Sequence, residues 1–298
     1  MEYINDSILK KVYQPRPENA HKYDFGYLLI IGGSHLYTGA PALIAMAALR
    51  AGIDLSFVIA PQRAADIIAS FSPNLIAYPL KGQDLGYQHL SSLISLTESA
   101  KRASRGKIAV AIGGGIGRDE KTQKLVNEYL LRIDIPAVID ADALYAVSRY
   151  YHPFPSKDIF QGKKFLLTPN THEFFILSGI DISKMSLEEK SQVVKDFAQK
   201  ENITVLLKEE PDIISDGENI FLNNTGCPEM SVGGTGDTLT GICGCFLSQQ
   251  IEPIMAASAA AYLHGKAGEI AKEQLGAGLL ATDIIESVPK VIKRFNIK

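Results

Sequence analysis

Short, uninterrupted apolar runs alternate along the chain with longer segments whose apolar positions recur at helical spacing. The clearest run is Tyr27–Ile31, which ends at a Gly-Gly pair, and the small-residue segment Pro41–Gly52 that follows it is predicted to be helical. Continuous apolar strands separated by helical segments are typical of a mainly parallel sheet that is covered on both faces. The pattern therefore predicts an α/β fold with three layers, α/β/α, around a mainly parallel central sheet.

Further elements extend this pattern along the chain. The predicted strands are Leu55–Ala60, Lys107–Ile112, Pro136–Asp140, Phe165–Thr168, Ile203–Leu207 and Asp212–Ser215. The predicted helices are Leu90–Ala103, Asp119–Leu131, Thr171–Ser178, Leu187–Gln199 and Met255–Gly268. A turn at Asp216-Gly217 predicts that antiparallel strands join the sheet late in the chain, and beyond residue 236 the pattern is almost purely helical. Stretches 151–157 and 251–253 are too short to mark a domain boundary, so residues 1–298 are expected to form a single domain.

Composition excludes several classes of protein. With 30 Lys and Arg against 33 Asp and Glu, the formal charge is −3, which lacks the cation excess that nucleic-acid binding requires. No apolar run reaches the roughly 18 residues of a membrane-spanning helix, and the N-terminus resembles no signal peptide. Three cysteines, Cys227, Cys243 and Cys245, form neither a disulfide framework nor a CxxC zinc motif. We therefore expect a cytoplasmic protein that binds neither nucleic acid nor membrane.

The strongest local signal for chemistry is the stretch 231–241, SVGGTGDTLTG, at the start of a predicted helix. Glycines there let the backbone approach a ligand closely, and the first amides of a helix lack partners and lie at the positive end of its dipole. This pattern predicts an anion hole for phosphate, beside which Asp237 could accept a proton from a hydroxyl group. A glycine-rich turn with an acidic helix start is the alternative that the stretch alone leaves open.

Other glycines and polar residues also follow predicted strands, which is where parallel sheets bind ligands. They are Gly32–Ser34, Gly113–Gly117, Asp140 and Thr168–Glu173. Asp140 and Asp142 either organise metal or phosphate through water, or cap the following helix. A surface lysine at a strand end is one interpretation of Lys208. His264, in a helix rich in Ala and Gly, is expected to serve helix packing, and the two helical cysteines are expected to be buried.

The stretch 233–241, GGTGDTLTG, is similar to the anion-hole motif of the ribokinase-like superfamily. More closely, the chain resembles the nucleotide-dependent NAD(P)HX dehydratases, repair enzymes that return hydrated NADH and NADPH to usable coenzyme. Segments that match this family stand in family order: PRP at 15–17, HKYDFG at 21–26, IGGS at 31–34, YTGAP at 37–41, AALRAG at 47–52, glycines at 113–117, IDADAL at 139–144, YLHG at 262–265 and LLATD at 279–283. The family's epimerase domain, often fused in front, is expected to be missing, because little precedes Pro15.

The resemblance implies a reaction and a set of site residues. A nucleotide, ADP or ATP with ADP favoured, would phosphorylate the hydroxyl of the S epimer of hydrated NADH or NADPH (NADHX or NADPHX), and phosphate would then be eliminated. Asp237 would activate the hydroxyl, and Mg²⁺ would bridge phosphate oxygens. The implied nucleotide and phosphate contacts are Lys208, Gly234, Thr235 and Gly236, and the implied substrate contacts are Ala40, Gly115, Gly117, Asn170 and Asp237.

Two departures from the family pattern bear on these roles. Asn170 stands where the family usually has a histidine, and with Glu173 it forms an N-x-x-E pattern. That pattern is similar to the one in small-molecule kinases of the superfamily, where the two side chains organise metal and phosphate; a helix N-cap at Asn170 is the structural alternative. At Glu209 and Glu210 the family has small residues, so these acids either point outwards or alter nucleotide binding.

Three functions therefore stay open. The first is an NAD(P)HX dehydratase, expected to be a homo-oligomer with a separate epimerase in the same pathway. The second is a small-molecule kinase of the same fold that acts on a hydroxymethyl or hydroxyethyl group, which would leave a stable phosphoester instead of releasing phosphate. The third is a non-catalytic sensor of nucleotides or metabolites, which would bind its ligand without turnover.

Overall fold

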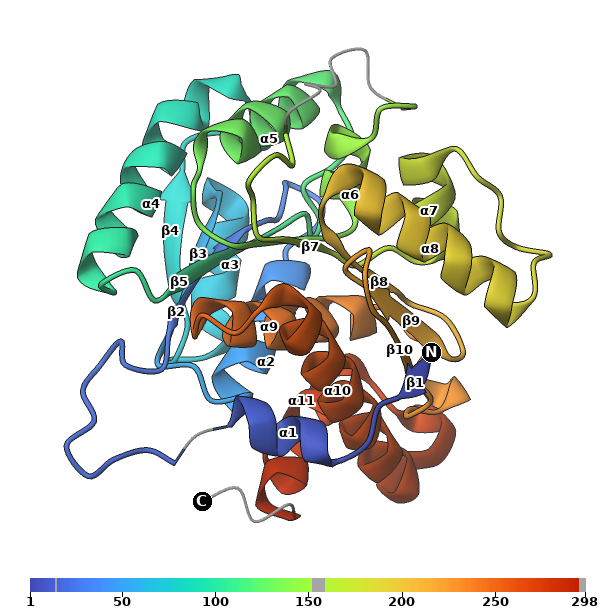
Figure 1. Ribbon diagram of the computed structural model, residues 1–298. Helices are drawn as coiled ribbons and strands as arrows, with labels where there is room; N and C mark the ends of the chain where they lie inside the picture. The colour runs from blue at the N-terminus through green and yellow to red at the C-terminus, as the bar shows by residue number, and fades with distance from the viewer. Residues whose placement is uncertain (14, 152–158, 295–298) are drawn as a thin grey trace.

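A computed structural model describes residues 1–13, 15–151 and 159–294, and it confirms the predicted three-layer α/β/α fold (Figure 1). Its ten-stranded sheet has the order β1-β10-β9-β8-β7-β6-β5-β2-β3-β4. The strands are β1 (Glu2–Tyr3), β2 (Tyr27–Ile31), β3 (Leu55–Pro61), β4 (Ile76–Leu80), β5 (Ile108–Ile112), β6 (Ala137–Ile139), β7 (Phe165–Leu167), β8 (Thr204–Leu207), β9 (Asp212–Ser215) and β10 (Ile220–Asn223). Neighbours pair in parallel except β9, which is antiparallel to β8 and β10, as the Asp216-Gly217 turn predicts. Of the stretch 151–157, all but its first residue lies outside the described residues.

Helices cover both faces of the sheet (Figure 1). One face carries α4 (Leu90–Ala103), α5 (Glu120–Arg132), α6 (Asp142–Val147), α7 (Thr171–Ser178) and α8 (Leu187–Glu201). The other face carries α1 (Ser7–Val12), α2 (Ala40–Arg50), α3 (Gln62–Phe71), α9 (Thr235–Ser248), α10 (Pro253–Leu275) and α11 (Ala281–Arg294). Short 3₁₀ turns are η1 (Tyr87–His89), η2 (Pro228–Met230) and η3 (Gly276–Gly278).

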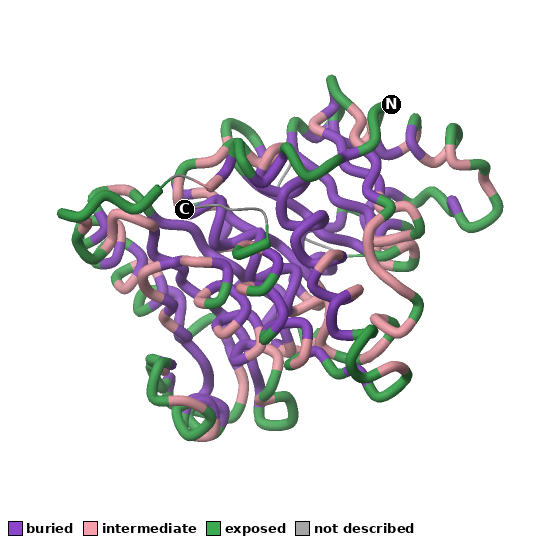
Figure 2. Tube along the Cα trace, turned by 90° about the horizontal axis from the view of Figure 1, so that it is seen from below, coloured by how far each residue is buried: buried purple, intermediate pink, exposed green. Residues whose placement is uncertain are grey.

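The central strands bury both of their faces, which is why their sequences are continuously apolar. In β2, Leu28 and Ile30 belong to the core under α2 and α9, whereas Tyr27, Leu29 and Ile31 belong to the core under α4 and α5. Successive strand residues point to opposite faces, so one apolar run supplies two cores. Figure 2 shows the buried positions gathered through the interior and the exposed positions at the outer loops and ends.

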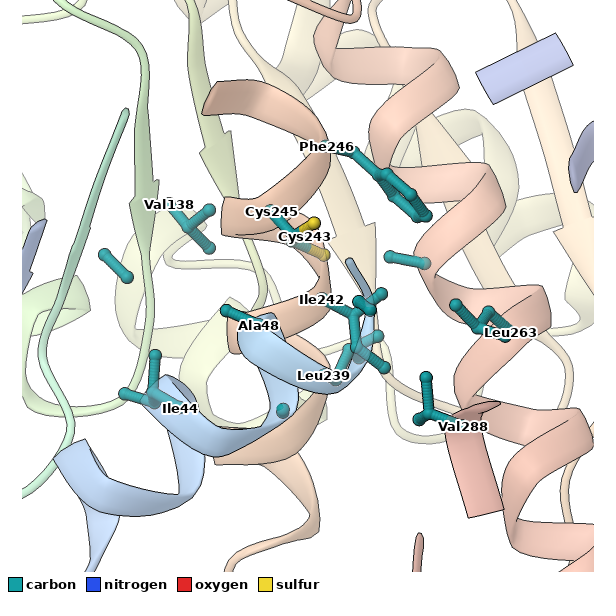
Figure 3. Packing of buried hydrophobic residues seen from close by; sticks show 14 of the residues in the cluster. Ile44, Ala48, Val138, Leu239, Ile242, Cys243, Cys245, Phe246, Leu263 and Val288 are labelled. Carbon is teal, nitrogen blue, oxygen red and sulfur yellow. The ribbon is translucent and has the colours of Figure 1, made fainter. Parts of the chain in front are cut away.

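The packing of α9 against α2 places the start of α9 at the carboxyl ends of the strands. A Cβ at Gly241 would lie 2.2 Å from the Ile44 carbonyl oxygen, so the two helices can approach this closely only at glycine. Figure 3 shows the neighbouring core, to which α2 contributes Ile44 and α9 contributes Leu239. Cys243 and Cys245 are fully buried there, which confirms the expectation for them. Among the described helices, none is long and apolar enough to cross a membrane.

The sequence pattern did not predict the elements at either edge of the sheet. β4 is an edge strand with Ile76 and Tyr78 exposed and with Pro79 before its last residue. Edge strands tolerate this composition and central strands do not. β1 has two exposed residues and pairs with β10, and α1 has six residues, too few for a periodic signal. These elements form because they pack on neighbours that are distant in sequence.

Candidate functional site

The first turn of α9 leaves its backbone amides available. Gly234 precedes it with φ +94°, in the left-handed region that favours glycine. The N-cap side chains of α5, α7 and α8 accept backbone amide protons, whereas α9 has no such cap in the described structure. The Thr238 amide donates to the Gly234 carbonyl at 3.1 Å, and the amides of residues 235–237 have no hydrogen-bond partner among the described residues. The predicted anion hole therefore corresponds to a helix start whose amides can receive an anion.

Asp237 lies in this turn, beside the glycine loop that follows β5. A Cβ at Gly114 would lie 2.9 Å from Oδ1 of Asp237 and 3.2 Å from Cβ of Ala40, so glycine allows the carboxylate, the loop and the start of α2 to meet. Asp237 is half-buried, and burial together with the negative charge of Asp140 raises the pKa of Asp237 to about 7. A carboxylate with this pKa can accept a proton from a hydroxyl group at neutral pH.

The glycine loop is held in place by its neighbours. Gly115 has φ +68°, and a Cβ there would lie 2.7 Å from Cβ of Tyr37. The Gly117 amide donates to Oδ2 of Asp142 at 3.0 Å, and Nε of Arg118 donates to Oδ1 of the same carboxylate at 2.7 Å. Asp142, in the first turn of α6, thus fixes the loop that contains two of the predicted substrate contacts.

The helix-capping alternative for Asp140 and Asp142 is wrong. The N-cap of α6 is Ala141, and no side-chain cap bond is formed there in the described structure. Asp142 instead binds the glycine loop, and Asp140 points to the end of β8. The reason is that both carboxylates find charged or amide partners on other elements, which local spacing does not reveal.

Lys208, directly after β8, reaches the other side of the same helix start. Its Nζ lies 2.8 Å from Oδ1 of Asp140 and 3.7 Å from Oε2 of Glu173, and a Cβ at Gly236 would lie 3.4 Å from it. Burial opposes the charge of this ammonium, but the carboxylates of Asp140 and Glu173 outweigh burial and raise the pKa of Lys208. The side chain of Lys208 is 21% exposed and its ammonium pairs with Asp140. Lys208 is therefore not a solvated surface lysine.

Asn170 and Glu173 cap the start of α7 reciprocally. The Glu173 amide donates to Oδ1 of Asn170 at 2.9 Å, and the Asn170 amide donates to Oε2 of Glu173 at 2.8 Å. The N-cap alternative is thus confirmed, on the helix Thr171–Ser178 that the sequence predicts. Burial raises the pKa of Glu173, and the nearby ammonium of Lys208 acts in the opposite direction.

A cavity of about 680 Å³ opens between the turn after β8, the loop before α9, and α10. Lys208, Thr235 and Gly236 line it, whereas a Cβ at Gly234 would meet Leu43 and Ala281 instead. Its volume is that of a small-molecule site. The remaining predicted contacts do not line it in the described structure: Asp237, Ala40, Gly115, Gly117 and Asn170. The first turn of α9 therefore separates this cavity from a second face, toward β5 and α2, that carries Asp237.

Glu209 and Glu210 both line the cavity, so they do not simply point outwards. Nζ of Lys190, on α8, lies 2.6 Å from Oε1 of Glu209, and the Thr171 hydroxyl donates to the same oxygen at 3.3 Å. Glu210 is exposed and forms no ion pair with the residues that the structure describes. One of the two carboxylates is therefore neutralised, and the other adds negative charge to the cavity wall.

His264 and Asp212 also line the cavity, although no sequence motif marks them as ligand contacts. Nε2 of His264 lies 2.7 Å from the Thr238 hydroxyl, and burial lowers the pKa of His264 to about 4, so the ring is neutral. Its burial confirms the expected packing role, but the ring also faces ligand space. Burial raises the pKa of Asp212 to about 7, against a hydrogen bond that the Asn223 side chain donates at 2.9 Å. Only the folded arrangement brings both residues beside Lys208.

The fold and this strand-end site place the chain among the ribokinase-like α/β proteins. A ribokinase-like superfamily protein from Enterococcus faecalis aligns with a TM-score of 0.81 and 26% identity, over 100% of this chain and 97% of that one. An ADP/ATP-dependent NAD(P)H-hydrate dehydratase from Bacillus subtilis, co-crystallised with ATP/Mg²⁺, aligns with a TM-score of 0.81 and 25% identity over 99% of both chains.

Sequence comparison narrows this class to one family. The family profile described as NAD(P)H-hydrate dehydratase matches residues 28–290. The ADP-dependent (S)-NAD(P)H-hydrate dehydratase of Cenarchaeum symbiosum is 35% identical over 98% of this chain and 97% of its own length. The bifunctional NAD(P)H-hydrate repair enzyme Nnr of Pyrobaculum aerophilum is 40% identical over 94% of this chain and 53% of its own length, so the chain spans about half of such bifunctional relatives. The chain belongs to the NAD(P)H-hydrate dehydratase family.

Proposed function

We propose that this protein is a carbon–oxygen lyase that dehydrates the S epimer of hydrated NADH and NADPH, with ADP as the favoured phosphoryl donor and ATP as the other. The observation that carries the proposal is the first turn of α9, where available amides and the Lys208 ammonium adjoin a carboxylate whose pKa is about 7. Phosphoryl transfer relies on such charge stabilisation and on a base for the attacking hydroxyl. The names of the relatives support this substrate, and the Bacillus subtilis crystals grown with ATP/Mg²⁺ support the nucleotide.

Each part of the site has a task in this reaction. Asp237 accepts the proton of the substrate hydroxyl while the oxygen of that hydroxyl bonds to phosphorus. The amides of residues 235–237 and the ammonium of Lys208 balance the negative charge on the transferred group. The nucleotide supplies that phosphoryl group: its own phosphorus–oxygen bond breaks and AMP leaves from ADP, or ADP from ATP. Phosphate then departs from the substrate with the electrons of the carbon–oxygen bond, the neighbouring ring carbon gives up a proton to water, and the double bond of NADH or NADPH is restored.

Substrate and nucleotide would lie on opposite sides of the first turn of α9. We assign the substrate to the face with Asp237, Ala40, Gly115 and Gly117. We assign the nucleotide to the cavity face with Lys208, Thr235 and Gly236, and to the backbone of Gly234, which adjoins that face. At Gly117, no atom beyond its two chain neighbours lies within 4 Å of an added Cβ in the described structure, which leaves space for a ligand beside this residue. Because Oδ1 of Asn170 caps α7, this residue would contact substrate through Nδ2.

Magnesium would depend on the nucleotide for most of its ligands. Among the described residues, no group of three or more His, Cys, Asp or Glu side chains could hold a metal ion. Oε2 of Glu173 already accepts the Asn170 amide. Mg²⁺ commonly binds phosphate oxygens and waters with one or two carboxylates, so we assign Glu173 an indirect contact through water. None of the proton transfers above depends on a preformed metal cage.

We further propose a single-domain homo-oligomer that works in the cytoplasm, with a separate epimerase as its pathway partner. All described strands share one sheet, which supports one domain over residues 1–298. Exposed Phe71 and Ile76 beside the β4 edge support self-association, and three free cysteines suit a reducing compartment. The name of the Pyrobaculum aerophilum relative, a bifunctional NAD(P)H-hydrate repair enzyme, supports a second repair activity beside the dehydratase. Sedimentation of the purified protein tests the oligomer, and a monomer would refute it.

Incubation of the purified protein with the S epimer of hydrated NADH tests the proposed function. We expect the absorbance of the reduced ring to return in the presence of Mg²⁺ and ADP, more slowly with ATP, and not without nucleotide. Failure of both nucleotides to restore NADH would refute the proposal. Heat of nucleotide binding without turnover would favour the sensor instead.

The rate of this reaction is expected to rise with pH through about pH 7. Asp237 must be deprotonated to accept a proton, and its pKa is about 7. The value of kcat/KM should therefore be low in acid, half-maximal near this pKa and level above it. Steady-state rates over pH from about 5.5 to 8.5 measure the profile. A profile that is flat or that falls across neutral pH would exclude this carboxylate as the base.

Glu210→Ala is expected to lower the KM for ADP by about two- to fivefold at low ionic strength, because the variant removes an unpaired negative charge from the cavity wall. The difference should fade in about 0.5 M salt, where exposed charges are screened. Glu218→Ala, at an exposed position between β9 and β10, is the matched control and should leave KM unchanged. An unchanged or higher KM for Glu210→Ala would mean that its carboxylate faces solvent or supports the site.

A further inference from the structure

Asp140 connects the two faces of the site. It follows β6, and its side chain is 4% exposed. Its Oδ1 lies 2.8 Å from Nζ of Lys208, and its Oδ2 accepts a hydrogen bond from the hydroxyl of Thr240 at 2.8 Å. Thr240 is buried on α9, three residues after Asp237, and therefore on the same side of that helix. The two oxygens of this buried carboxylate therefore bind Lys208, a proposed nucleotide contact, and α9, the helix that bears the proposed base.

We propose that Asp140 is a positioning residue, which holds the ammonium of Lys208 at the start of α9 and adds a fixed negative charge beside Asp237. The link from this role to catalysis rests on the proposed function, whereas the position of Lys208 and the charge beside Asp237 do not. The substrate and nucleotide contacts proposed for this chain do not include Asp140.

The position of the Lys208 ammonium depends on the partners that hold it. A lysine side chain is flexible, so its ammonium occupies one place only if partners hold it there. A Cβ at Gly236 would lie 3.4 Å from Nζ of Lys208 and 4.0 Å from Oδ2 of Asp140, so the ion pair lies against the turn with the available amides. Glu173, at 3.7 Å from Nζ, is the more distant partner and also caps α7. Asp140 is therefore the nearer and more buried anchor.

Asp140 is in turn oriented by a residue of α9. A buried carboxylate is stable when its oxygens are paired or hydrogen-bonded, and charged hydrogen bonds of this kind are directional. The Thr240 hydroxyl meets Oδ2 from α9, so Asp140 is oriented by the same helix whose amides form the anion site. The orientation of the Asp140 carboxylate therefore depends on the position of α9.

Charged groups of both signs surround Asp237. The charged groups that face it are Asp140 after β6, Lys208 after β8 and Asp142 on α6. Beyond the effect of burial, Asp140 and Asp142 raise the pKa of Asp237, and Lys208 lowers it. Asp140 has the largest effect of the three. Neutralising Asp140 should therefore let Asp237 ionise at lower pH.

Asp140→Asn tests both parts of the proposal, because the amide keeps the shape of the side chain and removes its charge. We expect the Asp237 carboxyl carbon to titrate about 1 pH unit lower than in the wild type. We also expect the Kd for ADP, measured with Mg²⁺ by calorimetry, to rise about tenfold as Lys208 loses its anchor. Nuclear magnetic resonance of protein with ¹³C-labelled aspartate follows the titration, and Asp237→Asn assigns its signal.

Two further variants separate charge from geometry. Thr240→Val releases the orientation of Asp140 but keeps its charge, so Asp237 should titrate near the wild-type pH while ADP binds about threefold more weakly. Glu173→Gln removes the other partner of Lys208, and Asp237 should again titrate near the wild-type pH because Glu173 is not among the groups that face it. Thermal unfolding of each variant identifies any that do not fold.

Unchanged titration and unchanged ADP affinity in folded Asp140→Asn would overturn the proposal. If Asp237 titrates at lower pH in this variant but the Kd for ADP is unchanged, the positioning role is overturned. If Asp140→Asn does not fold, Thr240→Val decides: weaker ADP binding supports the proposal and wild-type binding overturns it. A wild-type protein that does not restore NADH would refute the proposed function, and the titration of Asp237 would still decide the role of Asp140.

Discussion

Asp237→Asn is expected to abolish turnover of hydrated NADH, with kcat lower by about a thousandfold or more. The amide has the shape of the carboxylate but cannot accept the hydroxyl proton, so the fold and the binding of ADP should stay largely intact. The neighbouring negative charge of Asp140 makes a neutral side chain well tolerated at this position, since that charge already raises the pKa of Asp237. Steady-state kinetics and calorimetry with ADP measure the two quantities separately.

Asp66→Asn is the matched control for this variant. Asp66 is an exposed residue on α3, where it accepts a hydrogen bond from the Gln62 side chain on its own helix. It should keep wild-type kcat. Near-normal turnover in Asp237→Asn would defeat the proposed mechanism, and loss of ADP binding together with turnover would mean that the residue supports the anion site.

Lys208→Met is expected to raise the KM for ADP about a hundredfold, the second large effect. Methionine keeps an apolar stem but removes the ammonium that lies at the start of α9. The variant should also unfold more easily, by about 2 kcal/mol, because Asp140 would keep only its hydrogen bond from Thr240. Enzyme kinetics over a range of ADP concentrations and chemical denaturation measure the two effects.

Lys190→Met tests whether any lysine near the cavity would give the same result. Nζ of Lys190 pairs with Glu209, which lines the cavity, but Lys190 itself does not line it in the described structure. Its loss should change the KM for ADP by no more than about threefold. Equal effects of the two variants would show that general charge, and not the position of Lys208, governs nucleotide binding.

The interior of the fold follows directly from sequence pattern. β2 and α7 have the bounds that the apolar run at 27–31 and the segment 171–178 predict. Both signals are local: a strand buried on two faces is continuously apolar, and α7 begins at Asn170, a residue type that favours helix starts. The edge strand β4 gave no such signal, because one of its sides faces solvent and its stability comes from pairing with β3.

The candidate site was predictable where backbone conformation demands glycine. The stretch 233–241 marks the start of α9, and the glycines at 113–117 mark the loop beside Asp237. The ion pair of Asp140 with Lys208 was not predictable, because 68 residues separate its members and only the order of strands brings them together. For the same reason, local spacing could not distinguish a capping role for Asp142 from its actual bond to the Gly117 amide.

A crystal structure of the protein with ADP and Mg²⁺ tests most directly whether the start of α9 binds phosphate beside Asp237. We expect the terminal phosphate of ADP to accept hydrogen bonds from the amides at the start of α9, with Nζ of Lys208 beside it and the Asp237 carboxylate facing the phosphorus from the side toward β5. Phosphate density elsewhere, with Asp237 turned into the protein interior, would contradict both the assigned site and the reaction built on it.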